Sequence, residues 1–89
     1  MKEVEGKIDY SEINLELLDL MALRFNKNKD KYPYGNSKNE IEANQLIWAA
    51  FRHIRKILQP IEGDPEDIKD HLAAVGCNMS MALDQINLK

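Results

Sequence analysis

Residues 63–85, GDPEDIKDHLAAVGCNMSMALDQ, decide the fold because they combine a helix start with a regular apolar repeat. We expect Asp64 to be the N-cap and Pro65 the first helical residue, with two acids in the first turn. Gly76 costs about 1 kcal/mol inside a helix relative to alanine, so we expect it to permit a close backbone approach. The apolar stripe of this helix is predicted to be Ile68, Leu72, Val75, Met79, Ala82 (or Leu83) and Ile86.

Two further helices are expected before this one. For the first, Asp9 with Glu12 forms a capping-box pattern, and apolar residues follow at helical spacing. Leu15, Leu20 and Leu23 widen its stripe beyond one face, so we expect burial on more than one side, partly against another subunit. For the second, Ser37 with Glu40 marks the start, and the predicted core face is Trp48, Phe51, Ile54 and Leu58.

The predicted fold class is therefore all-α. We expect one domain over residues 1–89, with helices at about 11–26, 38–59 and 65–87 and a basic loop at 26–37. A chain this small buries only about 60–65% of its unfolded surface. We therefore predict a compact three-helix bundle that assembles into a homo-oligomer.

Cysteine content and hydropathy indicate the compartment. Cys77 is the one cysteine among 89 residues, so no internal disulfide can form, and a lone thiol indicates a reducing compartment. The N-terminus lacks the apolar run of a signal peptide, and no stretch approaches a membrane span. We expect a soluble, cytoplasmic protein without membrane contact.

Positive charge is concentrated in two short segments although the net charge is −3. Residues 24–38 and 52–56 together hold 8 of the 12 basic side chains and 1 of the 15 acidic ones. The overall charge argues against a polymeric nucleic acid as partner, whereas the clustering favours a small anionic ligand. Solubility and charge matching at helix ends explain the clustering equally well.

The residues do not favour catalysis or a metal cofactor. Glu12, Glu16 and Asp19 share one face of the first helix, but a second acidic pair, which a magnesium pyrophosphatase needs, is not evident inside the second helix. His53 and His71 meet if their helices pack antiparallel, yet two histidines without a cysteine or a positioned acid predict zinc only weakly. Cys77 is expected to be a buried, inert thiol.

Residues 26–37 have a composition suited to a nucleotide. Tyr32 and Tyr34 flank a proline, and Gly35 and Asn36 follow, with lysines around them. Aromatic rings stack on bases for about 1–3 kcal/mol each, and charged hydrogen bonds to phosphate contribute about 1.5–3 kcal/mol. The alternative is a surface turn whose tyrosines cover the end of the bundle.

Three segments, NKNKDKYPYGN, AAFRHIRKIL and GDPEDIKDHLAAVGCNMSMALDQ, together resemble a phage family of small helical proteins, the anti-CBASS sponges. Relatives of that family are described as dATP/dGTP diphosphohydrolase-like and are distant from MazG-type pyrophosphatases. The resemblance implies a hexamer in the host bacterial cytoplasm that sequesters 3′,3′-cGAMP-type cyclic dinucleotides, and cyclic trinucleotides at separate sites, without catalysis. The alternatives are a MazG-like metal-dependent nucleotide pyrophosphatase and a protein-interaction module that binds no nucleotide. The chain departs from the hydrolase relatives because no tryptophan follows Asn36.

From the resemblance we expect two sets of ligand-binding residues. Tyr10 is predicted to stack on a base and one of the loop lysines to bind phosphate, while the loop motif residues shape the pocket. The residues of the other two motifs are assigned to the trinucleotide site. The full set is Tyr10, Lys27, Lys29, Lys31, Tyr32, Asn36, Arg52, His53 and His71.

Overall fold

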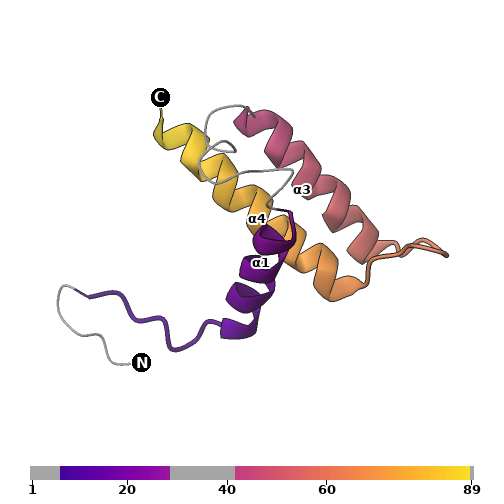
Figure 1. The fold of residues 1–89 in the computed structure, drawn as a ribbon, viewed down its shortest axis with the longest axis horizontal. Helices are drawn as coiled ribbons and strands as arrows, with labels where there is room; N and C mark the ends of the chain where they lie inside the picture. Colours follow the sequence, from indigo (N-terminus) through magenta and orange to yellow (C-terminus); the bar gives the residue numbers. More distant parts are fainter. Residues whose placement is uncertain (1–6, 29–41, 89) are drawn as a thin grey trace.

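The computed structural model describes residues 7–28 and 42–88. Within them the chain forms three helices, α1 (Leu15–Lys27), α3 (Ala43–Leu58) and α4 (Ile68–Asn87), and no strand. Helices α3 and α4 run side by side, and α1 lies across α4 (Figure 1). The all-α, three-helix prediction is confirmed. No helix of the described ranges is long and apolar enough to cross a membrane.

Small side chains allow α3 and α4 to pack closely. Ala50 of α3 and Ala73 and Ala74 of α4 are buried in the core. At one end, Leu46, Met81 and Ala82 form an apolar cluster, against which Phe25 of α1 packs. The buried positions of α4 recur at three- and four-residue steps, so they form one helix face: His71, Ala73, Ala74, Cys77, Met81, Ala82 and Gln85.

The predicted core faces of the second and third helices are mostly wrong. Trp48, Phe51 and Leu58 are 64%, 51% and 75% exposed. On α4, only Ala82 of the predicted stripe is buried, and its large members are exposed. The physical reason is that α4 carries two faces with helical spacing, and α3 packs on the face with alanines. Periodicity alone does not distinguish the two faces. The prediction therefore took the face with the larger apolar side chains, which is the wrong one.

Helix α1 has no buried residue within the single chain, and the expected contact of its wide apolar stripe with another subunit stays a prediction. It contacts α4 through one close crossing at Gly76. A Cβ atom added at Gly76 would lie 2.6 Å from Sδ of Met21, so only glycine fits without a shift. Gly76 does make room for a neighbour, but the group that comes close is the Met21 side chain and not the backbone that the sequence predicted. Next to this crossing, the Cys77 thiol donates a hydrogen bond to the Met21 carbonyl oxygen at 3.3 Å.

Each described helix starts later than its predicted range. Helix α1 is capped by Asn14, whose side chain accepts from the Glu16 N–H, while Asp9 accepts from the Ser11 N–H in a separate turn. Helix α4 is capped by Asp67, not Asp64, because Asp67 and Asp70 form a reciprocal capping box. The predicted cap of the second helix, Ser37 with Glu40, lies outside the described residues.

Candidate functional site

A turn between α3 and α4 brings acidic side chains to the start of α4. Gly63 has φ of +84°, which only glycine adopts readily, and the Asp64 N–H donates to the Ile61 carbonyl at 3.2 Å. Asp64 Oδ1 then accepts from the Glu66 N–H at 3.0 Å. This local hydrogen bond directs the carboxylates of Asp64 and Glu66 toward the first turns of α4.

Asp64 holds a buried histidine. His71 is 2% exposed, and its Nε2 lies 2.7 Å from Asp64 Oδ2. The pKa of Asp64 is lowered by the hydrogen bond from the Glu66 N–H and then by the one from His71, so this carboxylate is ionised and only accepts. Nε2 of His71 therefore carries the proton and donates it. A neutral His71 then has its lone pair on Nδ1.

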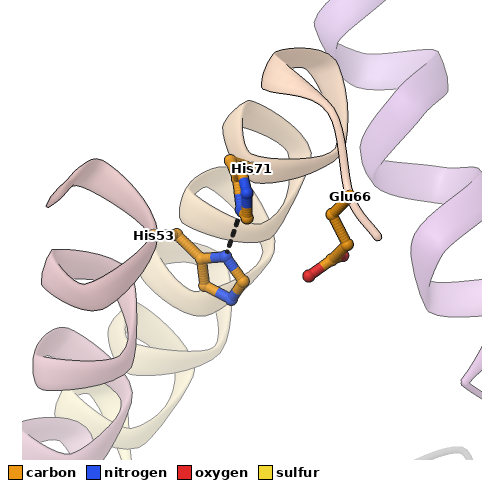
Figure 2. Close-up of side chains that lie close together, drawn as sticks. All are labelled: His53, Glu66 and His71. Atoms are coloured by element: carbon orange, nitrogen blue, oxygen red, sulfur yellow. Dashed lines mark hydrogen bonds between the residues drawn. The ribbon is translucent and has the colours of Figure 1, made fainter. Parts of the chain in front are cut away.

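Nδ1 of His71 faces a second histidine from α3. The Nδ1 atoms of His53 and His71 are 2.8 Å apart, as Figure 2 shows. Burial, and next the positive charge of Arg24, lower the pKa of His53, so the neutral imidazole is favoured. The two histidines therefore meet as expected for antiparallel α3 and α4, with one ring nitrogen donating to the other.

Glu66 completes a cluster of metal-binding residue types. Its Oε2 accepts from Arg24 Nη1 of α1 at 2.7 Å, and this bond is the main cause of its lowered pKa. One ligand atom each of His53, Glu66 and His71 lies within 4.8 Å of the other two. Within the described ranges this is the only such group of three residues.

A pocket of about 250 Å³ opens beside this cluster, between all three helices. Two guanidinium groups give it positive charge, an imidazole and two amides give it neutral hydrogen-bonding groups, and Phe25 gives it a ring. The lining residues are Arg24, Phe25, Asn28, Ala49, Arg52, His53, Cys77, Asn78 and Met81. Chemically, this lining suits an anion that carries an apolar ring or a sugar.

The structure brings together some of the predicted site residues. Arg52 and His53 line the pocket, and His71 contacts His53 from below the surface. Lys27, at the end of α1, is exposed and lines a shallower neighbouring pocket. Tyr10 is 61% exposed on the segment before α1 and does not line the pocket with Arg52. Lys29, Lys31, Tyr32 and Asn36 lie outside the described residues.

Sequence reasoning missed the roles of two acids at this site, Glu66 of the cluster and Asp64, which binds His71. Asp64 was assigned to a cap and Glu66 to the helix dipole, although both instead bind side chains. The spacing Asp64, Glu66, His71 around a glycine turn is the pattern from which they could have been found. Arg24 was counted only as charge, and its contact to Glu66 joins residues 42 apart in sequence.

Comparison with known proteins shows the family. The sequence profile described as dATP/dGTP diphosphohydrolase, N-terminal, matches residues 1–89, so the chain belongs to this family. Neither the curated proteins nor the solved structures give a significant match.

Proposed function

From the resemblance of its three sequence motifs to the anti-CBASS sponges, we propose that the chain binds cyclic dinucleotides of the 3′,3′-cGAMP type, and cyclic trinucleotides, and withholds them from host CBASS effectors without cleaving them. The observation that supports the proposal most is the pocket between the three helices, which Arg24, Arg52 and Phe25 all line. A guanidinium group binds phosphate through two parallel hydrogen bonds, and an aromatic ring stacks on a base. Both are features of a nucleotide site.

The size of the pocket supports a ligand shared between chains. Its volume of about 250 Å³ is below the roughly 300–1,000 Å³ of sites that enclose a ligand. One stack and two charged hydrogen bonds supply about 4–9 kcal/mol, whereas nanomolar binding needs about 12 kcal/mol beyond the cost of immobilising the ligand. A symmetric assembly presents each residue twice, so the proposed sponge is a homo-oligomer, with a hexamer expected from the resemblance.

Exposed apolar side chains support self-association. Leu15, Leu18 and Leu23 of α1 are 59%, 52% and 63% exposed, and Trp48 and Phe51 of α3 are exposed and in contact with each other. Large exposed apolar areas are typical of interaction surfaces. In the proposed assembly these side chains contact other chains, and the exposed Tyr10 ring reaches a ligand held at a subunit boundary.

The environment of the α1 acids supports binding without hydrolysis. Glu16 is exposed and its Oε2 accepts from Lys69 Nζ at 2.7 Å, so it already has a cationic partner. In the described part of the chain, the α1 acids belong to no group of three residues placed to hold an ion. A pyrophosphatase requires several carboxylates converging on its metal ions.

The second candidate function is hydrolysis of dATP or dGTP, and the family match favours it. In this alternative the chain supplies an N-terminal domain of a diphosphohydrolase, and metal-bound acids activate water. It predicts magnesium- or manganese-dependent loss of dATP or dGTP, and loss of that activity in Glu16→Gln.

One experiment separates the two candidates. The chain is incubated with 3′,3′-cGAMP, dATP or dGTP in the presence of magnesium, binding is measured by calorimetry, and the nucleotide released by heating is analysed by chromatography. We expect tight binding of 3′,3′-cGAMP and its full recovery intact, with Arg52→Gln weakening binding at least tenfold. Arg55→Gln is the matched control, because Arg55 is exposed on the same helix outside this pocket.

The outcomes divide cleanly. Intact recovery with weakened binding by Arg52→Gln supports sequestration. Degraded 3′,3′-cGAMP contradicts it, turnover of dATP or dGTP supports the diphosphohydrolase, and an absence of binding to all three nucleotides contradicts both candidates.

A further inference from the structure

We propose that His53, His71 and Glu66 form a binding site for a divalent transition-metal ion, with Zn²⁺ as the best fit. The three side chains come from α3, from α4 and from the turn between them, so the site joins the two helices (Figure 2). Two imidazoles and one carboxylate are donors that zinc accepts in three-ligand sites. Mg²⁺ and Ca²⁺ prefer oxygen donors alone.

The hydrogen bond between Asp64 and His71 is the feature that distinguishes this cluster from an ordinary polar contact. A metal-binding histidine almost always donates its other ring N–H to a carboxylate, a backbone carbonyl or water, which fixes the ring and raises its basicity. Asp64 Oδ2 accepts from His71 Nε2 at 2.7 Å, so Nδ1 is the nitrogen left for the ion. His71 is thus already fixed in the tautomer and orientation that metal binding requires.

The distances match a metal centre after small movements. Ligand atoms of a tetrahedral zinc site, with bonds of about 2.0–2.1 Å, lie about 3.3 Å apart. The two Nδ1 atoms are 2.8 Å apart, so they separate by about half an ångström on binding. Glu66 moves closer, since the three ligand atoms span at most 4.8 Å. Its turn segment and its 32% exposed side chain allow this movement.

The charges around the cluster also suit a cation. Arg24 binds Glu66 through Oε2, which leaves Oε1 for the ion while the arginine fixes the carboxylate. Asp64 and Glu66 supply two negative charges, and Arg24 and Lys56 supply positive charge near the histidines. Three protein ligands leave a fourth position for water or an anion, and His53 places the ion beside the positively charged pocket.

Metal binding is tested on the tag-free, full-length chain after treatment with a chelator and its removal. Zn²⁺ is titrated in competition with a chromophoric chelator, and Co²⁺ is used separately because a tetrahedral cobalt centre absorbs visible light. We expect one Zn²⁺ per chain, cobalt absorption typical of nitrogen and oxygen ligands, and no binding of Mg²⁺ at the same concentration. None of these readouts involves a nucleotide, so the result is independent of the proposed function.

Variants assign the ligands. His53→Gln and Glu66→Gln should each weaken Zn²⁺ binding at least tenfold, and Asp64→Asn by about 10–100-fold through His71. Two controls should remain within twofold of the original chain: Glu62→Gln, an exposed acid of the same turn, and Cys77→Ala, which removes the one thiol. Circular dichroism verifies that each variant is folded.

Thermal unfolding gives a second readout, because a ligand that binds the folded state raises the melting temperature. Zn²⁺ should raise it for the original chain and for Glu62→Gln, but not for Glu66→Gln or His53→Gln. The proposal is overturned if the original chain binds no Zn²⁺ at one equivalent. It is also overturned if both ligand variants bind as tightly as the original, or if Cys77→Ala abolishes binding.

Discussion

The contact between α3 and α4 has two ends of opposite chemistry. At the apolar end, Leu46 packs against Met81 and Ala82 without any directional bond. At the polar end, the buried His71 is held by hydrogen bonds to His53 and Asp64. Leu46 and His53 are two helical turns apart on the same face of α3. The comparison teaches that one helix face can be stabilised by burial at one end and by specific partners at the other.

The largest effect is expected at the apolar end. Leu46 is 3% exposed, and Leu→Ala at a buried site costs about 2–5 kcal/mol through lost burial and a remaining cavity. Leu46→Ala should lower the free energy of unfolding by this amount in urea denaturation. The matched control is Ile61→Ala, since Ile61 is 58% exposed and exposed positions usually change stability by less than about 0.5 kcal/mol. Equal effects of the two variants would contradict the assignment of the core.

The second expected effect is slow alkylation of Cys77, which lies on α4 between the apolar and the polar end of the contact with α3. Burial raises the pKa of this thiol from 9.0 to about 11. At pH 8 the thiolate fraction is then about one hundredfold lower than in the unfolded chain, and thiolate is the reactive form. Alkylation by iodoacetamide, followed by mass spectrometry, should be about a hundredfold slower in the folded protein than in urea.

The same shift predicts the direction of a pH effect. The folded protein keeps the Cys77 proton that the unfolded chain loses above pH 9, because the folded pKa is about 11. The unfolded state therefore binds fewer protons in this window, and the free energy of unfolding falls as the pH rises through it. For the alkylation test, equal rates at Cys77 in the folded protein and in urea would show that this thiol is open to solvent.

The smallest effect is expected at the polar end. Asp64→Ala leaves the His71 Nε2–H without its carboxylate, and a buried donor without a partner costs about 1–3 kcal/mol. Urea denaturation should show a loss in that range, smaller than that of Leu46→Ala. Asp64→Asn retains an acceptor oxygen and should recover at least half of the loss. A polar-end loss larger than the Leu46→Ala loss would reverse the comparison.

The sequence predicted the helices better than the faces that they bury. Gly76 was identifiable because glycine inside a helix needs a reason, and the 2.6 Å distance to Met21 supplies it. The face of α4 was not identifiable, because large apolar residues such as Leu72 and Leu83 share helical spacing with the smaller residues that α3 covers. Which face is buried depends on tertiary packing between alanines, and spacing alone does not contain that information.

Prediction of the site was limited in the same way. The meeting of His53 and His71 followed from antiparallel helices, and it is confirmed by their 2.8 Å contact. The positions of the Asp64 and Glu66 carboxylates depend on a turn with positive φ at Gly63 and on a hydrogen bond from Arg24 to Glu66. Turn conformation and contacts between distant residues result from the folded chain as a whole, so local sequence patterns did not reveal them.

The crossing at Gly76 has a consequence for how this chain can diverge. The thioether of Met21 occupies the space that a side chain at position 76 would need, although the two positions are 55 residues apart. A larger side chain at position 76 therefore requires the Met21 side chain to shift or to be replaced by a shorter one. A homologue with a larger residue at position 76 should carry a shorter one at position 21, and the two positions should covary across the family while their exposed neighbours vary freely.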